Sequence, residues 1–231
     1  NGGMLAVTGS TLLDARGIGG NGLDCAVCTV EGGSGIGGAA SIIAAKGAGF
    51  TFGDFVSIDA SGQGGSAAVD SGKDGGAGQG GTAFVRSDGG TITAAQSMAV
   101  RAQGTGGAGA SFNNLASGAP GTGGVGGNGT GGSASITAGD AATIGNGGLV
   151  SIVSDTVVSS VGTGGNGGTG GNGAGGTSAV SARNGTVSGT ALVVRSDGVG
   201  GNGFNAGAGG SGQGTRAEVI AYSALEGNGA V

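Results

Sequence analysis

One short pattern occurs five times along the chain, at residues 37–44, 80–87, 131–138, 175–182 and 214–221. Each copy opens on glycine and then places small, apolar and small residues at alternate positions, which is the signature of one face of a β-strand. The central apolar residue recurs after 43, 51, 44 and 39 residues. Like residues at a fixed period are what a stacked core requires. This core column consists of Ile42, Val85, Ile136, Val180 and Val219.

The period predicts an all-β fold, a β-solenoid of about five repeats of ~44 residues. We expect residues 1–231 to form a single repeat array, with a second strand-like block in each repeat. Examples of that block are Phe52 to Asp59, Ile92 to Arg101 and Val187 to Arg195. The repeats fall approximately at 1–36, 37–79, 80–130, 131–174 and 175–213, with a partial copy at 214–231.

Glycine also recurs at every third position between the strand blocks. The chain has 66 glycines but one proline, which excludes collagen. A period of three without proline predicts extended polyglycine II side arms, whose backbone groups must pair with neighbouring segments. In most repeats the pattern indicates an arm, a tip and a returning arm, whereas the fourth arm is nearly continuous. The glycines that define the longest arms are Gly123, Gly126, Gly129, Gly132, Gly164, Gly167, Gly170, Gly173 and Gly176.

Composition excludes several classes of function. The chain has no histidine, and its Lys46 and Lys73 stand alone in glycine-rich segments, so we predict no catalytic residues and no enzyme. The 13 acidic and 8 basic residues are scattered, and the formal net charge is −5, so no nucleic-acid partner is expected. No apolar run reaches the ~20 residues of a membrane span.

Two motifs in the first tip carry candidate chemistry. Cys25 and Cys28 form a C-x-x-C that we interpret as a local disulfide, with bonding between subunits or a free thiol pair as alternatives. Two cysteines without histidine cannot make a four-ligand zinc site. Asp24 fits a calcium nonapeptide, but such sites need a second copy nine residues on, so calcium is only a weak candidate and no cofactor is predicted.

Strand, glycine turn, strand and a GGxGGNGxGG arm together resemble the passenger repeats of autotransporter-type and filamentous-haemagglutinin-like surface proteins of Gram-negative bacteria. Two stretches carry the resemblance: 164–176 followed by 178–182, and 121–132 followed by 134–138. It implies a bacterial extracellular or cell-surface protein with an adhesive or scaffolding role, and no catalytic residues. The glycine run is also similar to mycobacterial surface repeats, which lack the long β blocks.

Two functions remain open from the sequence. The first is an extracellular structural filament in which copies of the chain join end to end, because Asn1 and Asn228 occupy the same phase of the repeat. An excerpt of a longer array would show the same phase. The second is an adhesin whose variable tips bind carbohydrate or another cell surface. Ice binding is only a minor alternative. It would call for a flat array of Thr-x-Thr motifs, and the motif occurs once, at Thr91 to Thr93.

Overall fold

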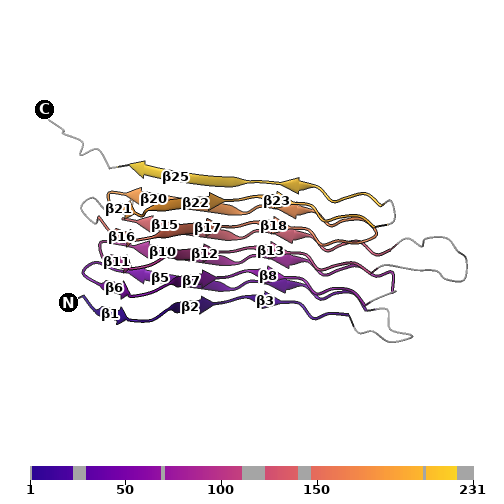
Figure 1. The fold of residues 1–231 in the computed structure, drawn as a ribbon, viewed down its shortest axis with the longest axis horizontal. Coiled ribbons are helices and arrows are strands. Elements are labelled where there is room, and N and C mark those ends of the chain that lie inside the picture. Colours follow the sequence, from indigo (N-terminus) through magenta and orange to yellow (C-terminus); the bar gives the residue numbers. More distant parts are fainter. Residues whose placement is uncertain are drawn as a thin grey trace, which may run out of the picture.

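The computed structural model describes residues 2–22, 30–68, 71–110, 123–139, 147–204 and 207–222. Within these ranges the chain forms twenty-five strands and no helix. The strands make five successive turns stacked along one axis (Figure 1), and each turn contributes one strand to each of five parallel sheets. The chain is therefore a β-solenoid of five turns, which confirms the predicted fold class.

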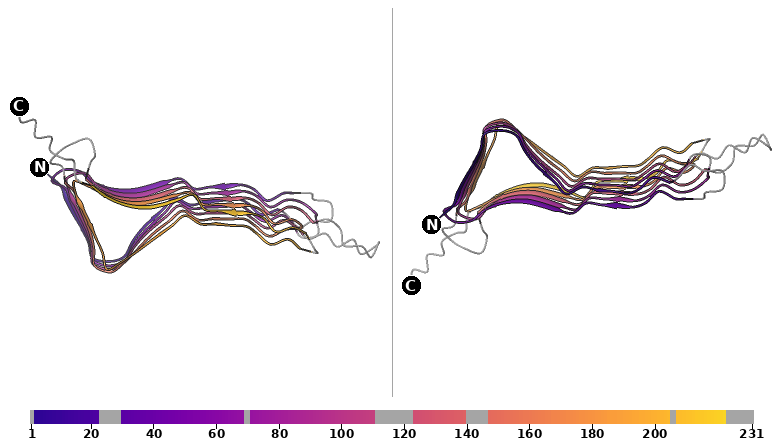
Figure 2. Two further views of the ribbon diagram at one scale, coloured as in Figure 1. Left: turned by 90° about the horizontal axis from the view of Figure 1, so that it is seen from above. Right: turned by 90° about the horizontal axis from the view of Figure 1, so that it is seen from below.

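Along its axis the solenoid has a triangular body, and a two-layered arm extends from one corner (Figure 2). Three of the five sheets are the sides of the triangle. Side 1 consists of β1 (Met4–Val7), β6 (Gly49–Phe52), β11 (Thr91–Ala94), β16 (Leu149–Ile152) and β21 (Thr186–Ser188). Side 2 consists of β2 (Thr11–Asp14), β7 (Val56–Asp59), β12 (Met98–Arg101), β17 (Asp155–Ser159) and β22 (Ala191–Arg195). Side 3 consists of β5 (Ala39–Ala44), β10 (Thr82–Ser87), β15 (Ser133–Ala138), β20 (Thr177–Arg183) and β25 (Arg216–Tyr222).

The other two sheets are short and lie in the arm, between side 2 and side 3 of each turn. The outgoing layer carries β3 (Gly17–Ile18), β8 (Gly62–Gln63), β13 (Gly104–Thr105), β18 (Gly162–Thr163) and β23 (Gly198–Val199). The return layer carries β4 (Gly35–Ile36), β9 (Gly78–Gln79), β14 (Gly129–Thr130), β19 (Gly173–Ala174) and β24 (Gly212–Gln213).

The register of side 3 places the five residues of the predicted core column side by side. Ile42 pairs with Val85, Val85 with Ile136, and the pairing continues through Val180 to Val219. Because this register does not slip, the unequal repeat lengths are absorbed outside the side 3 strands. Aligned columns of like side chains then fill the triangular body, and the largest buried ones are Ile58, Ile92, Met98, Ile136, Val56, Val85, Val100, Val150 and Val158.

The corner between side 3 and side 1 requires a left-handed backbone. Gly47, Gly89 and Gly139 have φ of 77°, 75° and 84° there, and Asn184 has φ of 55°. Glycine and asparagine are the residues that adopt this conformation at least cost. The sequence at this corner therefore closes each turn.

The second strand-like block of each repeat is divided into two strands. Between β6 and β7 the chain bends at Gly53 and Asp54, so that one block supplies a strand to side 1 and another to side 2. A closed triangular core needs this additional corner. No helix in the described ranges is long and apolar enough to cross a membrane.

Candidate functional site: the glycine arms and the two end faces

Backbone hydrogen bonds hold the arms together in two directions. The Gly64 N–H donates to the Thr105 carbonyl of the next turn at 2.8 Å, and the Gly65 N–H donates to the Gly33 carbonyl of the opposite layer at 2.8 Å. The bonds between layers form a zigzag through all five turns. Its donor–acceptor pairs are Gly33–Gly20, Gly65–Gly33, Gly76–Gly65, Gly107–Gly76, Gly127–Gly107, Gly165–Gly127, Gly171–Gly165, Gly201–Gly171 and Gly210–Gly201.

Close backbone approach, not left-handed geometry, is what requires glycine in the two layers. A Cβ on Gly164 would lie 1.9 Å from the Gly171 carbonyl oxygen, and one on Gly165 would lie 2.0 Å from that of Gly107. The third residue of the triplet, Asn166, faces solvent. All nine arm glycines predicted from the sequence lie in these layers, and each would bring a Cβ to 2.8 Å or less from backbone.

The fourth arm also reverses direction, although its glycine pattern is nearly continuous. The Gly171 N–H donates to the Gly165 carbonyl at 2.8 Å, so the chain turns back between these residues. A run of glycine imposes no barrier to such a reversal. The reversal of this turn therefore lies within the nearly continuous glycine run.

Asparagine side chains tie successive turns together on the outer surfaces of the arm. The Asn21 Oδ1 accepts the Ser66 N–H at 2.9 Å, and the Asn166 Oδ1 accepts the Asn202 N–H at 2.8 Å. On the return layer the Asn128 Oδ1 accepts the Asn172 N–H at 2.9 Å. This ladder is not among the features predicted from the sequence, although the repeated Gly-Gly-Asn triplet is its signal. Each asparagine satisfies a backbone donor that the glycine zigzag leaves facing outward.

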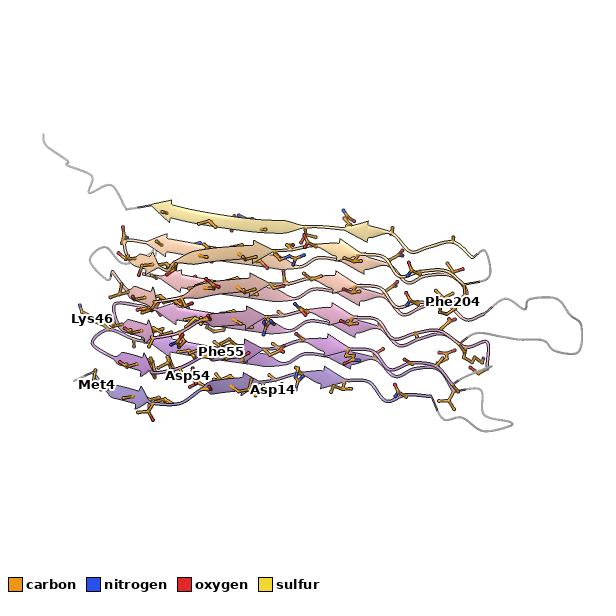
Figure 3. The ribbon with its side chains drawn as sticks, in the orientation of Figure 1. Met4, Asp14, Lys46, Asp54, Phe55 and Phe204 are labelled. Carbon is orange, nitrogen blue, oxygen red and sulfur yellow. The ribbon has the colours of Figure 1, made fainter. Side chains whose placement is uncertain are left out.

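The first and last turns expose most of the large apolar side chains. Of those exposed in the described residues, seven belong to the first turn, five to the last and four to the three turns between. At the last turn the triangular core opens into a hollow of about 220 Å³ lined by Val180, Val187, Leu192 and Val219. Met4 marks the opposite end (Figure 3) and is 80% exposed. In the described structure, each end face thus presents free strand edges around uncovered apolar side chains.

Val219 shows the effect of this position on the core column. The four preceding members of the column are buried, whereas Val219 is 63% exposed because no further turn covers it in the described part of the chain. A single residue type at one position in the repeat therefore has two environments.

Each end face also carries an ion pair in the same two columns of side 2. On the first turn Asp14 and Arg16 lie 2.7 Å apart (Figure 3 labels Asp14), and on the last turn Arg195 and Asp197 lie 2.8 Å apart. Hydrogen bonds from the Arg16 side chain lower the pKa of Asp14, and the same contact raises the pKa of Arg16. The order of the charges along the chain is opposite at the two ends.

A separate groove of about 410 Å³ lies on the outer face of side 3. Phe84, Arg86, Asp88, Ser135, Thr137 and Arg183 contribute to its walls. Arg86 and Asp88 form an ion pair at 2.8 Å. An aromatic ring among charged and hydroxyl groups is a chemically mixed surface that suits a polar ligand.

Other predicted positions lie outside the described residues. These are Asp24, Cys25 and Cys28, so the proposed disulfide and the weak calcium site stay predictions. Among the described residues, no three His, Cys, Asp or Glu side chains gather as metal ligands. On β11, Thr91 lies beside Gly49 and Leu149, which interrupt a regular Thr-x-Thr face, whereas Thr93 lies beside Thr51 and Ser151.

Comparisons with known proteins add no relative. No protein-family model, no curated protein and no solved structure matches the chain.

Proposed function

We propose that this chain is a non-enzymatic, extracellular structural protein that forms or belongs to a surface fibre, in which copies join end to end. The observation that carries the proposal is the pair of end faces, where free parallel strand edges surround uncovered apolar side chains. Free edges of this kind template further pairing. Within the described residues, the first and last turns carry most of the exposed large apolar side chains, and stacking of a further turn on either one would cover them.

We propose that the arms are polyglycine II segments that stabilise such a fibre, and their backbone hydrogen bonds to the next turn and to the opposite layer support this. Successive N–H groups leave each segment in different directions, and none of the zigzag bonds closes a ring within one segment. Each bond contributes about 1 kcal/mol net. Because the chain has few large apolar residues, this repeated backbone pairing offsets much of the entropic cost of ordering glycine.

Electron microscopy of the purified chain tests the proposal. We expect uniform fibres with an axial repeat of five turns, or about 24 Å at ~4.8 Å per turn. A chain that remains monomeric at high concentration, measured by sedimentation, would contradict end-to-end assembly. Long rods without subunit boundaries on native cells would instead identify the chain as a segment of a longer adhesin.

The groove on side 3 favours adhesion to carbohydrate as a second function. Its Phe84 ring offers an apolar face for a sugar, and Arg86 and Thr137 provide hydrogen-bond donors beside it. We expect binding to acidic glycans on an array, with Phe84→Ala reducing it about tenfold through loss of ring contact. The outward Ser41→Ala, in the same column but outside the groove, is the control. Equal binding by both variants would exclude the groove as the glycan site.

A further inference from the structure

We infer that the last turn of one copy stacks on the first turn of the next, head to tail and in register, so that all five sheets continue across the junction. This rests on the proposed function, because it specifies how copies join within the fibre. Only head-to-tail stacking keeps the strands parallel, as they are everywhere inside the chain. The partner is therefore a second copy of this chain presenting its opposite end.

Charge complementarity on side 2 sets the register. Strand pairing runs from Asp14 through Asp59, Arg101 and Ser159 to Arg195, so Asp14 and Arg195 occupy one column. Arg16 and Asp197 lie two residues further along the chain at the two ends. Stacked turns lie ~4.8 Å apart, so in register each carboxylate meets a guanidinium of the neighbouring copy. A shift by two residues would bring like charges together.

Outward-facing aliphatic side chains also match between the two ends. Ile18 shares an arm column with Val199, and they are 71% and 49% exposed in the single chain. Ile43 shares a side 3 column with Ile220. Stacking would cover each against its counterpart, and burial of apolar surface is the main source of association free energy. In the inner turns the same two columns carry only polar side chains: Gln63, Thr105 and Thr163, and Arg86, Thr137 and Ser181.

At two glycines the space that a Cβ would occupy is empty in the single chain but filled by the neighbouring copy in this stack. A Cβ on Gly20 would meet nothing within 4 Å, whereas a Cβ on its equivalent in each later turn would lie 2.0 Å from the carbonyl oxygen of the preceding turn. In the stack the Gly201 carbonyl of the neighbouring copy takes that place. At the other end a Cβ on Gly209 would lie 3.5 Å from the nearest atom, although its equivalent Gly170 would meet a following-turn carbonyl at 2.0 Å. The Asn202 side chain, by the pattern of the ladder, then accepts the Asn21 N–H of the next copy.

The substitution Gly20→Ala tests this register separately from fibre formation in general. We measure the critical concentration for assembly by sedimentation and the axial repeat by electron microscopy, with circular dichroism to verify the fold of the unassembled chain. The added methyl is expected to raise the critical concentration at least about tenfold while leaving the single chain folded. Gly189→Ala is the matched control, because its Cβ would make ordinary contacts of 3.4 Å or more beside the hollow of the last turn. Gly20→Ala fibres with an unchanged critical concentration and repeat would overturn the inferred register.

Charge reversal provides an independent test of the same junction. The double substitution Asp14→Arg with Arg16→Asp keeps the ion pair within the copy but places like charges across the junction. We expect the critical concentration to rise about tenfold at low ionic strength and less at high salt. Adding Arg195→Asp with Asp197→Arg restores assembly in the quadruple variant. If the double variant assembled at the same critical concentration as the wild-type chain, the charge register would be overturned and the proposed function would stand. A wild-type chain that forms no fibres would overturn both.

Discussion

Gly165→Ala is expected to destabilise the folded chain by about 3 kcal/mol, since its methyl must displace backbone in the middle of the arm. The new Cβ would lie 2.0 Å from the Gly107 carbonyl oxygen and close to the Gly106 carbonyl as well. Neither neighbour is a flexible side chain that can move aside. The Gly165 N–H also donates to the Gly127 carbonyl at 2.8 Å, so a shift here breaks the zigzag between the layers.

The free energy of unfolding from urea titration measures this effect, and hydrogen exchange locates it. Gly20→Ala, at the equivalent position of the first turn, is the control and should leave the unassembled chain unchanged because its Cβ meets nothing. Asn166→Ala in the same triplet should cost about 1 kcal/mol through loss of one hydrogen bond to the next turn. If Gly165→Ala and Gly20→Ala were equally stable, close packing of the arm layers would be refuted.

Ile136→Ala is expected to reduce the free energy of unfolding by about 3 kcal/mol. Ile136 is fully buried on the central turn, between Val85 and Val180 of the same column. Shortening it removes apolar contacts and leaves a cavity that the adjoining turns, fixed by backbone pairing, cannot collapse to fill.

Val219→Ala is the matched comparison, because it shortens a residue of the same column where the side chain is 63% exposed. Measured on the unassembled chain, its cost should stay below about 1 kcal/mol. In assembled fibres the same substitution should weaken association, since a neighbouring turn would cover the side chain. Equal losses for the two variants in the unassembled chain would show that the last turn is already covered.

Much of the fold follows from local periodicity. Alternation around Ile42 and its four equivalents identified side 3 and its register, because stacked turns require like residues at the same place. The glycine triplets located the arms, because glycine at two of every three positions indicates that neighbouring backbone segments approach too closely for side chains.

Other features depend on which residues lie side by side across turns. The corner at Gly53 and Asp54 was missed because the residues on either side of it are equally strand-like, and only closure of the triangular core demands the bend. The hydrogen bond from the Asn202 N–H to Asn166 joins residues 36 positions apart, so the Gly-Gly-Asn triplet marks each asparagine but does not reveal its partner in the next turn. The opposed ion pairs of the two ends become meaningful only once strand register places them in shared columns.

By itself, therefore, the sequence determined that the chain is a repeating, all-β solenoid with glycine arms, since period and composition act locally on every turn. Tertiary structure alone decided the triangular section, the place where the fourth arm reverses and the character of the two end faces. Those properties depend on distances between turns and on which side chains no further turn covers. A valine of the side 3 core column is buried in an inner turn but exposed in the last turn, and only the stacked arrangement makes that distinction.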